Sequence, residues 1–165
     1  MDFWEIIEKR RSTRKFLNKK IEKEKIEKIL TAANLAPSAH NWQSYKIYLI
    51  EDKTLRQKLV PAACDQEFVG EAPAVLVFVS CPPQPGRSQF YSHQDATIAC
   101  YQAWLAAVDL GLSAVWVGAF VEEKVKKLLN LPEDQIPVAI LPIGYAGENP
   151  KETSRKSLEE LVTRF

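Results

Sequence analysis

Two short, uninterrupted apolar runs constrain the fold of this chain more than any other feature. Residues Ala74 to Ser80 read Ala-Val-Leu-Val-Phe-Val-Ser, and residues Val138 to Gly144 read Val-Ala-Ile-Leu-Pro-Ile-Gly. A strand with one solvated face alternates apolar and polar residues, whereas these runs are apolar at nearly every position. Both are therefore predicted to be strands that are covered on both faces, and helices are the elements that usually cover them.

The rest of the chain supplies helices and further strands. Glu22 to Asn34 has apolar side chains at helical spacing and charged residues opposite, which predicts a surface helix. His93 to Leu110 is rich in alanine and apolar most of the way round, so we expect a central helix or one at a subunit contact. Other predicted elements are a strand at Tyr45 to Ile50, a helix capped by Asp52 or Thr54 and ending near Ala63, a Pro-rich loop at Pro82 to Gly86, a strand at Ser113 to Val117 and a helix at Glu122 to Leu129. Strands alternating with helices predict a layered α/β or α+β domain.

Length and charge exclude several classes of protein. With 165 residues, we expect a single domain spanning 1–165. The net charge of +1 gives no field that favours nucleic acid or a membrane surface. The apolar stretch from Ala96 to Gly118 is interrupted by Asp109 and by a Gly-Leu-Ser break, so we do not expect a transmembrane helix.

Cysteine and histidine usage indicates a reducing compartment and no metal centre. The three cysteines, Cys64, Cys81 and Cys100, form no Cys-x-x-Cys pair, and the chain has only two histidines. The acidic N-terminus has no apolar segment of the kind that signal peptides carry. We expect a cytoplasmic protein without a metal site.

A cluster of cations follows the first predicted helix, and two hypotheses explain it. Residues Arg10 to Phe16 read Arg-Arg-Ser-Thr-Arg-Lys-Phe and come after a helical stripe that includes Phe3 and Ile7. Extending that stripe places Arg10 toward the core, where a guanidinium needs an anion, and Arg14 would join it if the helix continued. Alternatively, the cations are solvated at a helix C-terminus, where positive charge suits the helix dipole. The segment alone leaves both hypotheses open.

Several common motifs are missing. The chain has no Gly-x-Gly-x-x-Gly, no Gly-x-x-x-x-Gly-Lys-Ser/Thr and no Gly-x-Ser-x-Gly, so no Rossmann site, P-loop or nucleophile elbow is indicated. Ser38, His40 and Asp95 are present, but their spacing does not favour a catalytic triad.

A second polar segment changes the interpretation of the cation cluster. Residues Ala36 to Gln43 read Ala-Pro-Ser-Ala-His-Asn-Trp-Gln, a loop suited to hydrogen bonds with a planar polar edge. Together with Arg-Arg-Ser-x-Arg-x-Phe, this loop closely resembles the nitroreductase family of FMN-dependent NAD(P)H oxidoreductases, of which the chain would be a short member. Further matches in the same order are Glu71-Ala72-Pro73, Asp95 to Leu112, Trp116 to Phe120, Pro142 to Tyr145 and Arg155 to Leu158.

The resemblance implies an α+β three-layer fold with a central mixed sheet, in an intertwined homodimer whose flavin sites lie at the interface. It implies that Arg10 and Arg155 grip the FMN phosphate, with Ser12, Arg11 and Lys156 nearby. Guanidinium groups from two segments suit a phosphate dianion, because each can bind two oxygens. The homodimer would also explain the alanine-rich helix, for which the alternative is a central core helix in a monomer.

The resemblance assigns other residues to the flavin ring. Arg14 would face the pyrimidine edge and stabilise negative charge on the reduced flavin. Gly118 and Ala119 would lie near flavin N5. The second subunit would contribute the residues Pro37, Ser38, Ala39 and Asn41.

The implied activity is a ping-pong cycle in which NAD(P)H passes a hydride to flavin N5 and a small acceptor, such as a nitroaromatic or a quinone, then takes it. The protein would supply orientation and electrostatics, so we nominate no catalytic side chain. Ser44-Tyr45 stands where many members have Pro-Trp, a difference expected to loosen the turn without touching the flavin. The loop between Ser80 and Tyr91 is short and no long insertion follows Gly118, so a small or open site is expected.

Three other functions remain open at this point. The same fold and flavin could serve a specialised reaction, such as dehalogenation, oxidation of a heterocycle or flavin breakdown. The chain could also be a non-catalytic flavin-binding protein. Nucleic-acid binding by the charged block from Lys9 to Lys28 is disfavoured, because glutamates interleave its cations and it lacks aromatic residues for stacking.

Overall fold

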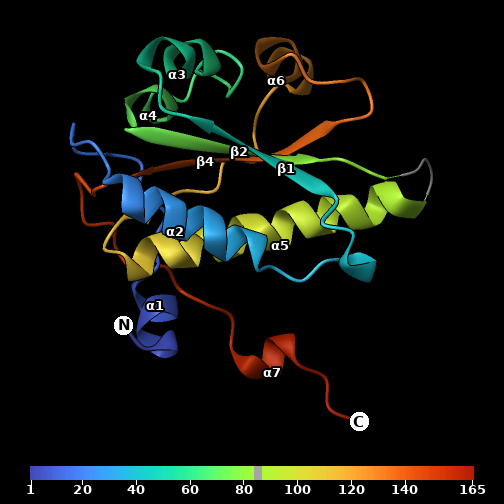
Figure 1. Ribbon diagram of the computed structural model, residues 1–165. Coiled ribbons are helices and arrows are strands. Elements are labelled where there is room, and N and C mark those ends of the chain that lie inside the picture. Colours follow the sequence, from blue (N-terminus) through green and yellow to red (C-terminus); the bar gives the residue numbers. More distant parts are fainter. Residues whose placement is uncertain (84–86) are drawn as a thin grey trace.

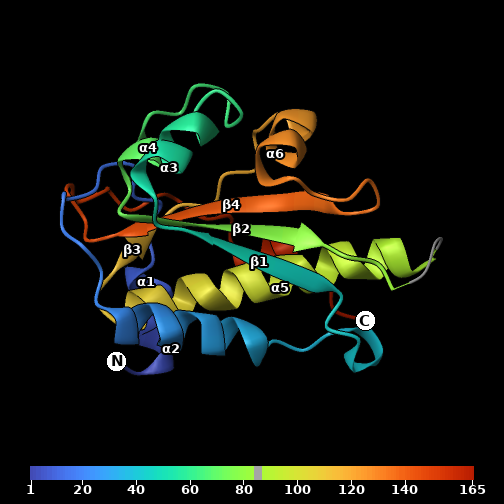
Figure 2. The same cartoon turned by 45° about the horizontal axis from the view of Figure 1, so that its top comes forward.

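The computed structural model describes residues 1–83 and 87–165 and shows three layers (Figure 1). A sheet forms the middle layer, helices α2 and α5 cover one face, and α3, α4 and α6 cover the other (Figures 1 and 2). The helices are α1 (Phe3–Lys9), α2 (Lys23–Asn34), the short 3-10 helix η1 (Ala39–Asn41), α3 (Lys53–Leu59), α4 (Phe68–Glu71), α5 (Arg87–Asp109), α6 (Glu122–Leu129) and α7 (Leu158–Leu161), and the strands are β1 (Tyr45–Ile50), β2 (Ala74–Ser80), β3 (Ser113–Ala114) and β4 (Ile136–Gly144).

The two apolar runs form the two central strands, as predicted. The strand order is β1-β2-β4-β3, and every residue of β2 is buried. Leu76 and Phe78 belong to the core cluster shared with α2 and α5, whereas Val75 and Val77 belong to the cluster on the other face. The two-residue period of a strand thus places apolar side chains in both cores.

The expectation of a mixed sheet was wrong for the strands described here. All pairs between the four strands, β1–β2, β2–β4 and β3–β4, are antiparallel. The connection through α3 and α4 starts and ends at the same end of the sheet, because Ile50 pairs with Val75. Helix α5 does return the chain so that β3 runs in the direction of β2, but β4 lies between them (Figure 2). Within residues 1–83 and 87–165, parallel pairing is found only at an isolated bridge between Ser12 and Ala114.

The bounds of several elements agree closely with the prediction, because the spacing of apolar residues and the capping or flanking residues indicate the same start and end. The strand β1 and the helix α6 have the predicted bounds, and Asp52 caps α3 by accepting a hydrogen bond from the Leu55 amide at 2.8 Å. The helix α3 ends at Leu59 rather than near Ala63, and turns follow it. The predicted loop from Pro82 to Gly86 includes residues 84–86, which lie outside the described residues.

Two predicted elements have different lengths in the structure. The helix α5 starts at Arg87, before the predicted His93, because Phe90 and Tyr91 stand side by side among polar residues and form no apolar stripe at helical spacing. The strand β3 stops at Ala114, although a bridge between Val117 and Ile140 resumes the pairing.

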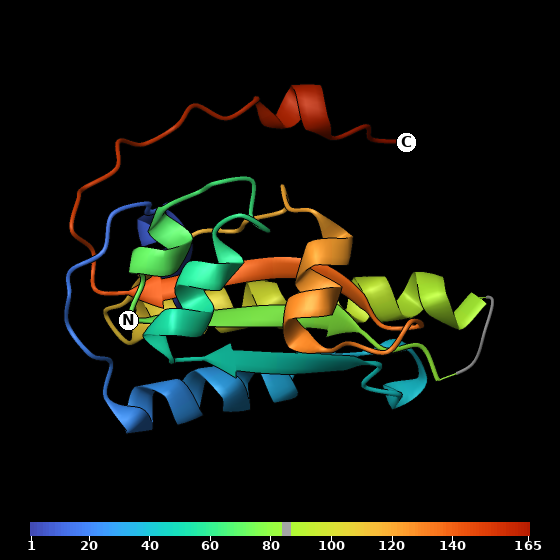
Figure 3. The same cartoon turned by 90° about the horizontal axis from the view of Figure 1, so that it is seen from above.

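The two ends of the chain lie outside the layered body. The helix α1 has no buried residue, and Phe3, expected to face the core, is 61% exposed. Residues 151–165 are all exposed, and Figures 1 and 3 show this segment, with α7, extending away from the other elements.

None of the helices in the described part of the chain has the length and apolar character needed to cross a bilayer.

Candidate functional site

The cation cluster begins where α1 ends. A capping box formed by Asp2 and Glu5 starts the helix, and Arg10, with extended backbone, closes it while its amide donates to the Ile6 carbonyl at 3.0 Å. The helix therefore does not continue to Arg14. The following residues instead lie beside β3, where the Thr13 amide donates to the Ala114 carbonyl at 3.1 Å.

A carboxylate from the C-terminal part of the chain fixes the second half of the motif. Glu148 Oε1 accepts hydrogen bonds from the Arg14 amide at 2.5 Å and from the Lys15 amide at 3.1 Å. The Gly147 amide also donates to the Lys15 carbonyl at 2.7 Å. These contacts hold the N-terminal motif against the segment that leads into the C-terminal tail.

The motif and the C-terminal segment enclose a small cavity of about 210 Å³, which we call the arginine cavity. The structure thereby brings Arg10, Arg11 and Ser12 together with Arg155, the residues that the resemblance assigns to the phosphate. Arg14, which the resemblance assigns to the flavin ring, lines the same cavity. The residues that line this cavity are Arg10, Arg11, Ser12, Arg14, Pro150, Lys151, Thr153 and Arg155. Lys156 is not among them and is exposed on the tail.

The arginines of this cavity differ in how their guanidinium groups are bonded. Arg11 Nη1 donates to the carbonyls of Glu8 and Arg10, and its Nη2 lies 3.7 Å from the Glu152 carboxylate. Arg155 Nη1 donates to Thr153 Oγ1 at 2.6 Å. Both side chains therefore already hold acceptors of this chain.

Arg10 and Arg14 keep their donors free. Within residues 1–83 and 87–165, neither guanidinium donates a hydrogen bond or meets a carboxylate. Arg10 is half-buried, and its Cζ lies 4.6 Å from the ring centroid of Trp104 on α5. The cavity therefore has guanidinium donors without an anion of the chain, which is the donor set of a phosphate site.

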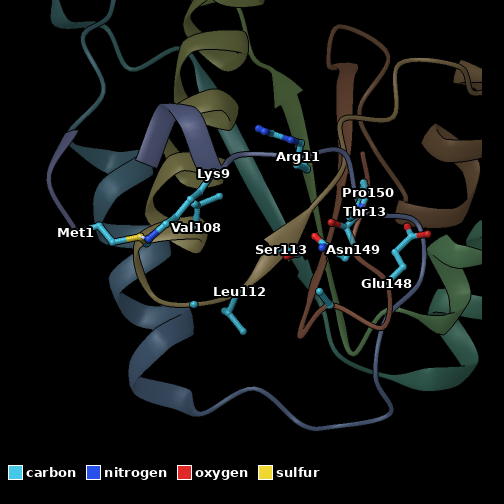
Figure 4. A pocket seen from close by; sticks show the side chains of 12 residues that line it. Met1, Lys9, Arg11, Thr13, Val108, Leu112, Ser113, Glu148, Asn149 and Pro150 are labelled. Carbon is cyan, nitrogen blue, oxygen red and sulfur yellow. Dashed lines mark hydrogen bonds between the residues drawn. The ribbon is translucent and has the colours of Figure 1, made fainter. Parts of the chain in front are cut away.

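A larger pocket of about 300 Å³ lies beside the arginine cavity and shares Arg11 with it. Figure 4 shows Lys9, Val108 and Leu112 on one side and Thr13, Asn149 and Glu148 on the other. Its wall includes the Glu148 carboxylate, and like charge disfavours a dianion there. The arginine cavity is therefore the better candidate for an anion.

The loop predicted to touch the flavin ring lies elsewhere in the chain. Pro37 and Ser38 lead into η1, which begins at Ala39 and ends at Asn41, near the opposite end of α5 from α1 (Figure 1). One subunit therefore does not bring these four residues to the arginine cavity.

This loop has an unusual backbone that side chains hold in place. His40, Asn41 and Gln43 have φ values of 51°, 55° and 51°, a conformation that costs free energy in residues other than glycine. The Gln43 amide donates to Ser38 Oγ at 3.0 Å, and the Ala39 amide donates to Asp95 Oδ1 at 2.9 Å. Asp95, on α5, is 2% exposed, and its Oδ2 has no partner among the described residues.

Tyr45, which follows the loop, is partly buried, and its surroundings change the pKa of its phenol. Burial first, and the Asp95 charge second, raise the pKa of the Tyr45 phenol above its ordinary value. The phenol therefore stays protonated and donates to the Ala33 carbonyl at 2.8 Å.

Gly118 and Ala119 form a third group, between β3 and α6. Both are exposed, and the Ala119 carbonyl accepts a hydrogen bond from Gln66 Nε2 at 3.1 Å. Gln66 thus contacts the backbone of the predicted flavin-facing segment. A Cβ at Gly118 would lie 3.3 Å from Trp116 Nε1.

The chain matches known proteins over most of its length. The model of the nitroreductase family matches residues 7–80 and 63–145. A relative named as a putative NADH dehydrogenase/NAD(P)H nitroreductase, from Methanothermobacter thermautotrophicus, is 34% identical over 91% of this chain and 80% of its own. The oxygen-insensitive NADPH nitroreductase of Salmonella typhimurium is 30% identical over 92% of this chain and 69% of its own.

Solved structures agree with this relationship. The NADPH:FMN oxidoreductase from Vibrio harveyi, solved in complex with NAD+, superposes with a TM-score of 0.91 at 26% identity and covers 98% of this chain and 76% of its own. The sequence matches and the shared fold lead to one conclusion: the chain belongs to the nitroreductase family.

Proposed function

We propose that this protein is an FMN-dependent oxidoreductase that transfers a hydride from NAD(P)H to a small electron acceptor, such as a nitroaromatic or a quinone, in a ping-pong cycle. One observation carries the proposal. Arg10, Ser12 and Arg14 at one end of the sequence meet Arg155 at the other around the arginine cavity. The names of the relatives, a nitroreductase and an NADPH:FMN oxidoreductase among them, support the same activity.

The donors of the arginine cavity fit the FMN phosphate. Arg10 offers a guanidinium group without a competing acceptor among the described residues, and Ser12 contributes a hydroxyl to the lining. A guanidinium binds phosphate oxygens in pairs, so the terminal phosphate can be held by more than one side chain. Arg11 and Arg155, which already hold carbonyls and side chains of this chain, would mainly add positive charge.

FMN supplies the redox chemistry when it is bound, and the protein supplies its place and its electrostatics. We propose that Arg14, which is exposed beside the cavity, places a fixed positive charge near the pyrimidine edge of the ring. Such a charge favours the more negative, reduced form of the cofactor. Gly118 and Ala119, which are exposed and have small or no side chains, would leave space for substrate.

We infer that the complete site requires a second copy of the chain in a homodimer. The loop at Pro37 to Asn41 lies away from the arginine cavity of its own subunit, so a second subunit would have to bring it there. Apolar side chains are exposed where such a copy would pack. They are Phe3 and Trp4 on α1, Phe90, Ile98 and Tyr101 on α5, and Leu158 and Leu161 on α7. An apolar surface of this kind commonly marks a protein interface.

A cytoplasmic location fits the cysteines. Cys64, Cys81 and Cys100 are all free thiols in the structure. Burial raises the pKa of the Cys100 thiol well above its ordinary value, so this thiol stays protonated and unreactive. We therefore propose a reducing, cytoplasmic environment.

Substitution of the two arginines tests the phosphate site. Arg10→Ala and Arg155→Ala should each weaken FMN binding, measured by titration of the protein with FMN, more than the matched control Lys20→Ala. Lys20 is exposed and lies outside the lining of the arginine cavity. Lys25 is unsuitable as a control, because its Nζ donates to the Leu110 carbonyl and to Tyr145 Oη. Equal FMN affinity in all three variants would refute the phosphate role.

Turnover tests the reaction. NADH or NADPH should be oxidised in the presence of nitroaromatics or quinones, and parallel lines in a double-reciprocal plot would show the ping-pong order. If the flavin is bleached by NAD(P)H but none of these acceptors restores it, a specialised reaction such as dehalogenation becomes the better proposal. If NAD(P)H does not bleach it, the protein is a flavin carrier.

A further inference from the structure

The guanidinium of Arg10 rests on an aromatic ring. Its Cζ lies 4.6 Å from the ring centroid of Trp104, a distance typical of a cation–π contact. Trp104 is only 5% exposed and belongs to the core cluster between α5 and the sheet. Its α5 neighbours Cys100, Ala103 and Ala107 are fully buried, so the surrounding packing fixes the ring.

This contact holds Arg10 without occupying its hydrogen-bond donors. An aromatic face attracts the cation through its π electrons, whereas a carbonyl or carboxylate accepts the N–H groups themselves. Two other arginines of the cavity differ from Arg10 in this respect. Arg11 Nη1 and Arg155 Nη1 both donate hydrogen bonds to oxygens of this chain. Arg10 is thus fixed in position with its N–H groups available.

Core packing alone does not explain a tryptophan at position 104. Its Nε1 is buried and has no acceptor among the described residues. A buried N–H group without an acceptor is destabilising, and phenylalanine or leucine would fill the core without it. Tryptophan instead offers Arg10 an aromatic face, and the face of tryptophan binds a cation better than the face of phenylalanine does.

We propose that Trp104 is a positioning residue of the phosphate site: it holds the Arg10 guanidinium with its donors free and thereby increases the preference of the protein for FMN over riboflavin, which lacks the phosphate. This inference rests on the proposed function. It concerns a side chain that does not line the arginine cavity.

The test compares the Kd of FMN with the Kd of riboflavin in matched variants. Trp104→Leu should weaken FMN binding between about 3-fold and 30-fold, the range of one cation–π contact, and leave riboflavin binding unchanged. Trp104→Phe should lie between wild type and Trp104→Leu. In an Arg10→Ala background, Trp104→Leu should cause no further loss of FMN affinity.

An isosteric series keeps the test valid if Trp104→Leu does not fold. Fluorinated tryptophans incorporated at position 104 preserve the shape of the ring and progressively weaken its attraction for a cation. The FMN affinity should fall stepwise with fluorination, while the riboflavin affinity should stay constant.

Two results would overturn the inference. If the variants weaken FMN and riboflavin equally, Trp104 acts through packing alone; if they change neither affinity, the contact has no role in binding. Either result leaves the proposed function standing, provided that the wild-type protein prefers FMN. A folded wild-type protein that binds neither flavin would refute the proposed function and this inference together.

Discussion

At the scale of single residues, the same side-chain type plays different parts within one motif. Arg10 stacks on Trp104 with free donors, Arg11 holds carbonyls of α1 and its end, and Arg14 is fixed only through its amide. The motif contains three arginines, and only their surroundings separate the proposed phosphate ligand from a structural contact. Asp95 is a comparable case, because its importance depends on burial that the sequence does not reveal.

Replacement of Asp95 should loosen the loop around η1. Asp95→Ala removes the acceptor for the Ala39 amide and should lower the free energy of unfolding by about 1–3 kcal/mol, the usual effect of leaving a partly buried donor unsatisfied. The same variant should weaken FMN binding, because this loop is proposed to complete the site. Urea unfolding and FMN titration measure the two effects.

Asp95→Asn is the matched control, since its amide oxygen can still accept from Ala39. It should retain most of the stability and FMN affinity that Asp95→Ala loses. If both variants behave like wild type, Asp95 does not hold the loop.

At the scale of elements, the bounds of a helix or strand could be predicted where the apolar pattern and the flanking residues indicated the same limits. The strands β1 and β2 and the helix α6 have the predicted bounds, because apolar pattern and flanking residues agree. The start of α5 was missed, since Phe90 and Tyr91 in its first turns form no apolar stripe at helical spacing. The mixed sheet was wrong because the order of helices and strands does not specify which strands become neighbours.

The candidate site, too, could be predicted only in part from the sequence. The N-terminal motif and Arg155 were expected to meet, and the structure places them around one cavity. Trp104 was not expected to matter, because no motif marks a ring under a guanidinium. Such contacts depend on the packing of elements that lie far apart in the sequence.

The end of β4 should not tolerate a larger residue at Gly144. An added Cβ would lie 2.6 Å from Pro73 Cδ and 2.9 Å from Phe16 Cδ1, so Gly144→Ala should lower stability by about 1–3 kcal/mol. Gly118→Ala is the control, since its nearest contact is 3.3 Å from Trp116 Nε1. Thermal melting should show a clearly lower midpoint for Gly144→Ala, and equal midpoints would contradict the packing described here.

A polar network joins β4 to α2 and gives a pH-dependent prediction. The Tyr145 hydroxyl accepts from Lys25 Nζ at 3.0 Å and donates to Glu22 Oε2 at 2.5 Å. The hydrogen bond from Tyr145 is the main cause that lowers the pKa of Glu22. Because the pKa of Glu22 is lower in the folded than in the unfolded protein, ionised Glu22 stabilises the fold. This stabilisation is complete at pH values above the ordinary pKa of a glutamate and is lost as the pH falls through the lowered pKa of the folded protein.

Tyr145→Phe should therefore be less stable than wild type at neutral pH, and the difference should shrink in acid. Urea unfolding of both proteins from neutral pH to below the ordinary pKa of a glutamate measures it. A difference that stays constant over this range would show that Glu22 is not the partner that matters.

At the scale of the whole molecule, the exposed apolar residues and the separated parts of the site have one explanation. The loop at η1 and the arginine cavity lie apart in one subunit, and α1, α5 and α7 expose apolar side chains. A homodimer would cover these side chains and bring the two parts together.

Removal of residues 151–165 tests this explanation. The segment is exposed along its whole length and supplies Arg155 and α7. The shortened chain should shift toward monomer in light scattering at low concentration and should lose FMN affinity. The substitution Arg155→Ala separates the two effects, since it should lower FMN affinity and leave the dimer intact.

The visible absorption spectrum of the purified, folded protein tests the central claim most directly. After addition of FMN and removal of the excess, we expect bound flavin absorbance, bleaching on anaerobic addition of NADH or NADPH, and recovery when a quinone is added. A protein that melts cooperatively, and is therefore folded, yet retains no FMN would contradict the proposed function.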